Sequence, residues 1–248
     1  MSNPLRIALV AEGPTDAVVI EAALRAMLGG RPFVLTQVFP EDSSAFGSMG
    51  TGWVGVYKWC HGAAARGNGR LSGDGLFFST GNYDLLLLHL DADVAGYHYS
   101  NGSLNPLPTD GVLPCAKACP PPEATTNELR KVLLSWCGEA ATPSRTVLCM
   151  PSKNTEAWVV ALLFSTDQAI VQGIECYLNP ESRLGQQPKA VRIRKKKRDY
   201  LSRSAQLEQA WPRIATPAGV GEALRFQTEF LAAVPAPPTP PATSAPVP

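Results

Sequence analysis

The chain has 248 residues, of which 45% are hydrophobic and 17% are charged, and its formal net charge is +1. A chain of this length buries enough apolar surface to fold as one domain with appendages, without help from disulfides or metals. The charge balance excludes a protein that is basic throughout, and the 23 prolines and 21 glycines follow no period, which excludes a collagen-like repeat. Local excesses of charge can still be hidden inside this near-neutral total.

The N-terminal forty residues predict a strand, a helix and a second strand, in that order. Residues 5–11 are an apolar, β-favouring run that is stopped by glycine and proline. A helix is predicted over 17–28, because apolar residues recur there at helical spacing until a glycine pair ends the pattern. The apolar run at 32–39 predicts the second strand.

The middle of the chain continues the alternation of strands and helices. Residues 52–65 favour a helix, and 83–90 form a continuous apolar run that is typical of a central parallel strand covered on both faces. A proline-rich loop then leads to an amphipathic helix at 127–137, a short strand at 146–150 and an apolar helix at 155–164. This order predicts an α/β fold, with a mostly parallel central sheet and helices on both faces.

The last third of the chain is predicted to be a basic helical extension with a tail. Helices are expected at 207–211 and 222–232. The final residues hold only Pro, Ala, Thr, Ser and Val, which cannot build a core and predict disorder. We therefore expect an α/β domain at 1–165, a basic helical extension at 166–234 and a disordered proline-rich tail at 235–248.

Four acidic residues follow the predicted strands closely. Glu12 and Asp16 come after the first strand, and Asp91 and Asp93 come directly after the apolar strand at 83–90. The carboxyl ends of parallel strands share one edge of a sheet, so these side chains are expected to converge where such folds bind ligands. Crowded carboxylates need a counter-cation, and oxygen ligands suit Mg²⁺ or Mn²⁺, whose best-served chemistry here is phosphoryl transfer. Taken alone, Asp16 could equally be a helix cap without a role in binding, and Glu12 could equally be an ordinary acidic residue of a loop.

Glu156 is a fifth acidic candidate with two readings. It opens the predicted helix at 155–164, where the helix dipole alone favours an acid. The loop before it follows the strand at 146–150, so Glu156 can also reach the same sheet edge, with Ser152 and Lys153 nearby.

Two of these motifs resemble the signatures of the TOPRIM domain. Residues 12–16 (EGPTD) resemble its strand-terminal glutamate motif, and residues 91–96 (DADVAG) resemble its D-x-D motif with a glycine three residues on. TOPRIM domains occur in topoisomerases, bacterial primases, ribonuclease-maturation enzymes and OLD-family nucleases. The resemblance covers residues 4–150, and the chain has no room for the catalytic-tyrosine domain that topoisomerases add, so strand passage is not expected.

The chain also resembles the DUF4276-type TOPRIM-like proteins of bacterial phage-defence and mobile-element loci. That likeness rests on the EGPTD start, on residues 156–158 (EAW) and 229–231 (EFL), and on a basic C-terminal part. The resemblances imply a metal-dependent nuclease with Glu12 as general acid/base or ligand and with a late lysine, Lys153, in the catalytic set. They imply the following metal ligands: Glu12, Asp16, Asp91, Asp93 and Glu156.

A local excess of positive charge lies between residues 189 and 203, where Asp199 is the single acid. Such a cluster predicts salt-sensitive nucleic-acid binding, and Tyr200 beside it can stack on a base. The alternative is a solvated surface strip. The candidate nucleic-acid-binding residues are Lys189, Arg192, Arg194, Lys195, Lys196, Lys197 and Arg198.

The cysteines and histidines give weaker expectations. The six cysteines are expected to be free thiols, because the chain is large and begins without a signal-peptide pattern. A zinc site is the alternative, and its ligands would be Cys60, His61, Cys115 and Cys119. His89 is expected to be a packed core residue, and His98 is placed to touch substrate. We expect a cytoplasmic protein, and the longest apolar run is too short to span a membrane.

These observations together predict Mg²⁺- or Mn²⁺-dependent cleavage of DNA or RNA, in a bacterial defence or mobile-element context. One alternative is a catalytically silent module that binds nucleic acid or a partner protein. Another is a phosphohydrolase or transferase acting on a nucleotide or another small phosphorylated molecule. The phosphate-binding pattern GxxxxGK[ST] does not occur, so any ATPase would be a partner protein, for example one encoded in the same defence complex.

Overall fold

The computed structural model describes residues 3–40, 50–109, 111–189 and 192–236. Within these ranges the strands form one parallel four-stranded sheet in the order β2-β1-β3-β4. The strands are β1 (Leu5–Val10), β2 (Phe33–Phe39), β3 (Leu85–His89) and β4 (Thr146–Cys149). The predicted α/β fold with a parallel sheet is therefore confirmed.

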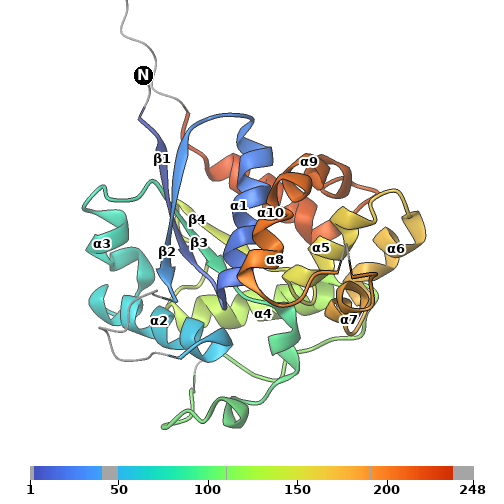
Figure 1. The fold of residues 1–248 in the computed structure, drawn as a ribbon. Helices are drawn as coiled ribbons and strands as arrows, with labels where there is room; N and C mark the ends of the chain where they lie inside the picture. Colours follow the sequence, from blue (N-terminus) through green and yellow to red (C-terminus); the bar gives the residue numbers. More distant parts are fainter. Residues whose placement is uncertain (1–2, 41–49, 110, 190–191, 237–248) are drawn as a thin grey trace, which may run out of the picture.

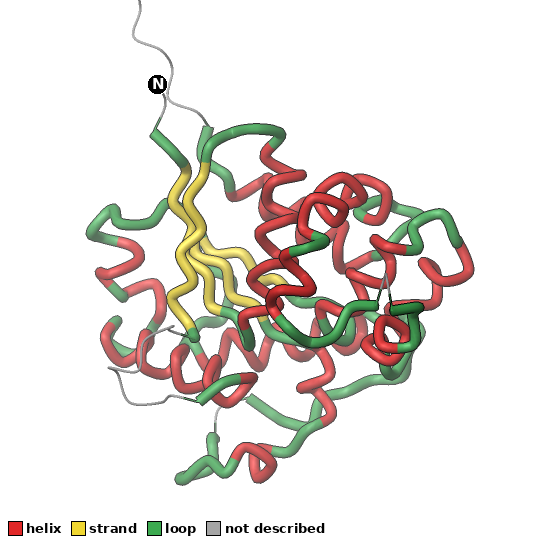
Figure 2. Tube along the Cα trace, in the orientation of Figure 1, coloured by secondary structure: helices red, strands yellow, loops and turns green. Residues whose placement is uncertain are grey.

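Helices connect the strands and cover both faces of the sheet (Figures 1 and 2). Before β4 the chain forms α1 (Pro14–Leu28), α2 (Gly52–Arg66), α3 (Gly75–Phe78) and α4 (Glu123–Trp136). After β4 it forms α5 (Thr155–Leu163), α6 (Gln168–Gly173), α7 (Pro180–Gly185), α8 (Lys197–Leu201), α9 (Ser204–Ile214) and α10 (Gly221–Ala233). Short 3-10 turns lie at Leu71–Gly73, Ala92–Gly96, Tyr99–Gly102 and Ile174–Cys176.

The two faces of the sheet carry separate hydrophobic cores, because successive strand residues point to opposite sides. In β3, Leu85 and Leu87 pack with α1, α5, α9 and α10, whereas Leu86 and Leu88 pack with α2 and α4. Figure 1 shows α1 and the C-terminal helices on one side of the strands and α2 and α3 on the other. Burial on both faces explains why β3 is apolar at every position before its final histidine.

The helices after residue 165 share the core of the sheet. Trp158 of α5 packs edge-on against Trp211 of α9, with ring centres 5.3 Å apart, and stacks on Phe226 of α10 at 5.8 Å. All three side chains are buried in the core that also contains Ile7 and Leu87. The sheet and the C-terminal helices are therefore packed as one body in the described ranges. Most of the predicted tail, 237–248, lies outside the described residues.

The predicted elements differ from the observed ones mainly at helix starts. α1 begins at Pro14 rather than at residue 17, because proline suits the first turn of a helix. α4 begins at Glu123, directly after three prolines, rather than at residue 127. The sequence pattern does not predict the short helices α6, α7 and α8, since each spans six residues or fewer and has no room for a helical period.

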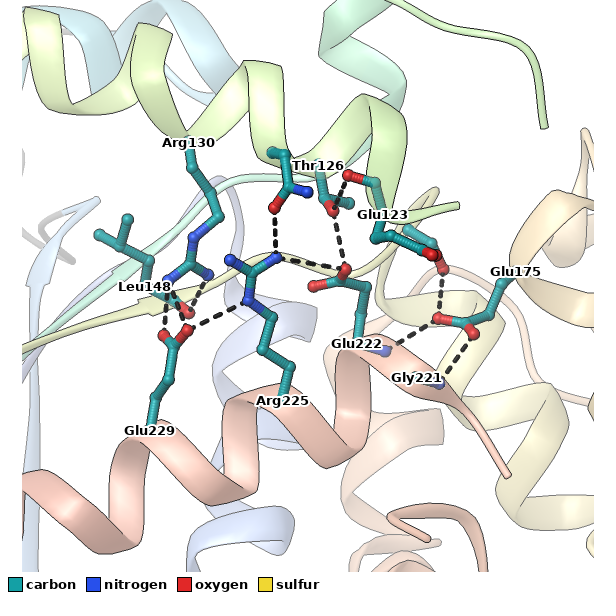
Figure 3. A network of polar contacts seen from close by, with 11 residues as sticks. Glu123, Thr126, Arg130, Leu148, Glu175, Gly221, Glu222, Arg225 and Glu229 are labelled. Atoms are coloured by element: carbon teal, nitrogen blue, oxygen red, sulfur yellow. Dashed lines mark hydrogen bonds and ion pairs between the residues drawn. The ribbon is translucent and has the colours of Figure 1, made fainter. Parts of the chain in front are cut away.

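A network of hydrogen bonds and ion pairs connects α4 with α10 (Figure 3). Nη2 of Arg130 donates to both carboxylate oxygens of Glu229, at 2.7 and 2.6 Å, and Nε of Arg225 donates to Glu229 at 3.1 Å. The carboxylate of Glu175 accepts from the backbone N–H groups of Gly221 and Glu222 at the start of α10. Glu229, the first residue of the EFL motif, is thus part of a structural contact between helices.

The expectation that every cysteine is free is wrong, because Cys119 and Cys176 form a disulfide. The loop before α4 brings their Cα atoms to 5.5 Å, which is within the range a disulfide spans. Cys119 is therefore not available to zinc. Cys60 is buried in the same core as Cys137, and His61 packs on Tyr57. Within the described part of the chain the four candidate zinc ligands do not assemble.

Among the described residues, no helix combines the length and the apolar character needed to cross a bilayer.

Candidate metal centre

Acidic side chains from three segments meet at the carboxyl edge of the sheet. Glu12 follows β1 by two residues, and Asp91 follows β3 by two residues. Asp16 lies in the first turn of α1, and Glu156 lies in the first turn of α5, which follows β4. In a parallel sheet these positions share one edge. The structure places these four carboxylates at one edge of the sheet, with Glu156, the fifth candidate, among them, whereas Asp93 lies at the rim.

A chain of hydrogen bonds ties these segments to one another. Oε1 of Glu12 accepts from the backbone N–H of Asp91 at 2.7 Å. Oδ1 of Asp91 accepts from the backbone N–H of Thr155 at 3.2 Å. The hydroxyl of Thr155 in turn donates to Oδ1 of Asp16 at 2.6 Å. The loops after β1, β3 and β4 are therefore held in a fixed mutual position.

His89, the last residue of β3, lies inside this acidic group. Its side chain has no exposed surface, and its Nε2 lies 3.1 Å from Oδ1 of Asp91. Asp16, His89 and Asp91 each offer one ligand atom, and these atoms all lie within 4.8 Å of one another. Neither ring nitrogen of His89 has a hydrogen-bond partner of good geometry among the described residues. The sequence predicts the burial of this residue but not its place beside the acids.

Glu156 is fully buried and connects the acidic group to the basic segment. Its Oε1 accepts from the hydroxyl of Tyr200 at 2.6 Å and lies 3.6 Å from Nζ of Lys195. Its Oε2 is buried without a partner among the described residues. The expectation that Tyr200 stacks on a base is wrong, because its ring is 1% exposed and its hydroxyl is bound to Glu156.

Asp93 and Lys153 lie at the rim of this centre. Asp93 is exposed, and its backbone N–H donates to the carbonyl of Lys153 at 2.9 Å, which joins the loops after β3 and β4. Asp93 is not one of the three residues whose ligand atoms cluster. Within the described ranges, Lys153 shows a backbone contact with this site and no ion pair to its carboxylates.

The surroundings of the acidic side chains raise their pKa values. Burial is the main cause that raises the pKa of Glu12, Asp91 and Glu156 above the ordinary carboxyl range. Nearby carboxylates add to the rise for Glu12 and Asp91, whereas Lys195 opposes it for Glu156. Solvent reaches part of the Asp93 side chain, but the protein atoms packed around it still remove enough hydration to raise its pKa to about 6. The site thus concentrates negative charge beyond what Lys195 offsets.

The residues present fit a divalent cation. Buried polar atoms normally have hydrogen-bond partners, and here the nitrogens of His89 and Oε2 of Glu156 have none among the described residues. Carboxylate oxygens and imidazole nitrogen are both common ligands of divalent ions. A cation held by Asp16, His89 and Asp91 would give one ring nitrogen of His89 a partner and offset the crowded charge.

The basic segment lies next to this centre. Lys195 has 59% of its side chain exposed and reaches Glu156, and α8, which begins at Lys197, packs against α1. Asp199 accepts from the backbone N–H of Arg194 at 3.1 Å, which stabilises the turn. The other basic candidates point to solvent, namely Lys189, Arg192, Arg194, Lys196, Lys197 and Arg198.

The fold and the site define a class: an α/β protein with a buried acidic centre at the carboxyl edge of a parallel sheet. No family model, curated protein or solved structure matches this chain. The likeness to TOPRIM and DUF4276-type proteins therefore stays a prediction.

Proposed function

We propose that this chain is a divalent-metal-dependent nuclease that hydrolyses phosphodiester bonds of DNA or RNA. The observation that carries the proposal is the convergence of Glu12, Asp16, Asp91 and Glu156 around the buried ring of His89, whose nitrogens make no hydrogen bond of good geometry among the described residues. Buried carboxylates that are not neutralised by the protein itself are typical of sites that hold Mg²⁺ or Mn²⁺.

Each acidic residue has a role that follows from its contacts. Asp16 and Asp91 would hold the ion, and Glu156, whose buried Oε2 has no hydrogen-bond partner among the described residues, would be a further ligand. A bound divalent ion supplies charge neutralisation at the phosphate and favours ionisation of water. Glu12 is fixed through Oε1 by the N–H of Asp91, which holds its carboxylate at the acidic edge, where it can take a proton from the attacking water.

Water, Glu12 and the phosphodiester account for the bonds and protons of the hydrolytic step. Water gives its proton to Glu12 while its oxygen bonds to phosphorus. The bond from phosphorus to the leaving sugar oxygen breaks, and that oxygen takes up a proton from solvent or from Glu12. Lys195 lies beside Glu156 with half of its side chain in solvent, so its ammonium can meet the phosphate as the charge of the transition state develops.

The exposed basic residues favour a polymeric substrate. Lys196, Lys197 and Arg198 follow Lys195 directly and point to solvent, so they form a positive surface leading to the acidic edge. Such a surface binds phosphates along a strand and gives salt-dependent affinity. A nucleotide-sized substrate would not need it.

A cleavage assay on the full chain tests the proposal. Labelled single- and double-stranded DNA and RNA are incubated with Mg²⁺ or Mn²⁺, and the wild type is compared with Asp16→Asn and Asp91→Asn. We expect cleavage by the wild type and loss of at least about 100-fold in both variants, because each removes a metal-binding charge. Glu21→Gln is the matched control on α1, since Glu21 only pairs with Arg25 at the surface.

Three results would contradict the proposal in different ways. Equal cleavage by Asp91→Asn would show that the acidic group is not the active site. Salt-dependent binding without cleavage would favour a silent nucleic-acid-binding module. Hydrolysis of nucleotides that is unaffected by neutralising Lys196 and Lys197 would favour a small phosphorylated substrate.

A further inference from the structure

We infer that His89 binds the metal ion directly through Nε2, and that the centre therefore prefers a first-row transition ion such as Mn²⁺ to Mg²⁺. The inference rests on the proposed metal-dependent function and names the class of ion that serves it. Its ligands are one imidazole nitrogen and the carboxylate oxygens of Asp16 and Asp91.

The strand fixes where the ring of His89 can go. His89 has the same parity in β3 as Leu85 and Leu87, so its side chain points to the face covered by α1 and α5. On that face, the first turns of α1 and α5 carry Asp16 and Glu156. The ring has no exposed surface, so it cannot satisfy its nitrogens with bulk water.

The position of Nε2 suits a shared ion better than a hydrogen bond. Nε2 and Oδ1 of Asp91 are 3.1 Å apart, but their geometry is not that of a hydrogen bond. Two ligand atoms that each lie about 2.1 Å from one ion, at a right angle, are about 3 Å apart. The observed separation is the one expected for adjacent ligands of a single cation.

The nitrogen ligand decides which cation is preferred. Mg²⁺ takes oxygen ligands and keeps much of its water, whereas imidazole adds affinity for transition ions. A centre built from carboxylates alone would hold Mg²⁺ well. A buried imidazole among carboxylates, as His89 is here, shifts the preference toward Mn²⁺ and later first-row ions.

The competing reading is an ion pair between a protonated His89 and Asp91, with the cation elsewhere or absent. Pulsed electron paramagnetic resonance of bound Mn²⁺ separates the two readings, because a directly bound nitrogen modulates the echo of the metal. The full chain is prepared with natural and with ¹⁵N-labelled histidine. The sequence contains three histidines, His61, His89 and His98, so the label reports on few positions.

We expect a nitrogen modulation that changes from the ¹⁴N to the ¹⁵N pattern on labelling. It should persist in His61→Gln and His98→Gln and disappear in His89→Gln. In competition titrations, His89→Gln should lower the preference for Mn²⁺ over Mg²⁺ at least about tenfold. Removing even an outer-sphere partner of a metal ligand typically lowers metal affinity by about tenfold or more, and loss of a direct ligand should cost no less. If His89→Gln does not fold, the labelled wild type and the other two variants still decide.

The outcomes separate the inference from the proposed function. If Mn²⁺ binds and is lost in Asp91→Asn, but shows no histidine nitrogen, the inference is overturned and the metal-dependent function stands. Persistence of the nitrogen signal in folded His89→Gln overturns the inference as well. If wild-type protein binds no Mn²⁺ at all, both are overturned.

Discussion

Asp91 is the residue through which the loops of the site are joined. Its backbone N–H donates to Glu12, and its carboxylate accepts from Thr155 and lies beside His89. The same carboxylate is buried next to Asp16, so its charge is unfavourable in the absence of a cation. The hydrogen bonds of Asp91 join the loops of the site, whereas its buried charge destabilises the folded protein when no cation is bound.

Asp91→Asn is expected to separate these two demands. Asparagine keeps an acceptor for the N–H of Thr155 but removes the charge, so we expect the metal-free variant to be more stable than wild type. Each kcal/mol of relieved repulsion should raise Tm by roughly 2–4 °C. The stabilisation that Mn²⁺ gives the wild type should be absent. Thermal unfolding with EDTA and with Mn²⁺ measures both, and equal Mn²⁺ stabilisation of the two proteins would refute the assignment.

The raised pKa of Asp93, about 6, predicts a pH dependence of the metal-free protein. Between the unfolded carboxyl value of about 4 and about 6, the folded state binds more protons than the unfolded state. Asp93 therefore contributes stability at low pH that is lost as the pH rises through this window. The contribution is small, because the side chain is exposed.

The measurement for Asp93 is the difference between wild type and Asp93→Asn. Urea unfolding in EDTA from pH 4 to pH 7.5 should show wild type losing stability relative to the variant as pH rises between about 4 and about 6. A difference that is flat, or that changes in the opposite direction, would show that Asp93 does not titrate as described.

At the scale of elements, the basic segment divides into one residue at the acidic centre and several at the surface. If the chain cleaves nucleic acid as proposed, Lys195→Met should reduce cleavage at least about tenfold with little change in nucleic-acid affinity, because the proposal places this charge beside the reacting phosphate. Neutralising Lys196, Lys197 and Arg198 together should instead weaken binding and reduce its salt dependence, by up to about 0.9 in slope for each phosphate that is no longer bound. Anisotropy titrations at several salt concentrations, together with cleavage rates, measure the two effects. Identical effects of the two sets would contradict the division.

The elements of the sheet were predictable because their physical signals are local. The apolar run that forms β3 and the glycine pair after α1 each determine their structure within a few residues. The convergence of Glu12, Asp16 and Asp91 followed from one further rule, that parallel strands end at a shared edge.

The features that sequence reasoning missed depend on contacts between distant segments. The pairing of Cys119 with Cys176 joins positions 57 residues apart. The hydrogen bond from Tyr200 to Glu156 spans 44 residues, and nothing in the sequence near either residue indicates it. His89 had a local signal, since it is the last residue of β3 and lies two residues before Asp91 in the sequence, but an apolar run ending in histidine is equally typical of simple burial.

At the scale of the whole molecule, the C-terminal helices and the sheet depend on one core. Trp158 packs against the aromatic rings of Trp211 and Phe226 in the same core as residues of the sheet. Trp158→Ala should lower the free energy of unfolding by about 3–5 kcal/mol, whereas Trp158→Phe should be much milder because it keeps the stacking on Phe226. Urea unfolding followed by both far-ultraviolet circular dichroism and tryptophan fluorescence measures this. Two separate transitions in the wild type would contradict a shared core.

The near-neutral net charge of the whole chain conceals two opposite local charges. Glu12, Asp16, Asp91 and Glu156 lie at the carboxyl edge of the sheet, and a run of basic residues lies just before and within α8. Lys195 belongs to the basic segment and lies 3.6 Å from Glu156, so the two regions are adjacent at this contact.

The most direct test of a metal centre at this edge is a crystal structure of the protein soaked with Mn²⁺, with anomalous scattering recorded for the ion. The structure predicts an anomalous peak between the side chains of Asp16, His89 and Asp91, and no such peak in crystals of Asp91→Asn. No peak at this edge in wild-type crystals, or a peak that persists in Asp91→Asn, would contradict the assignment.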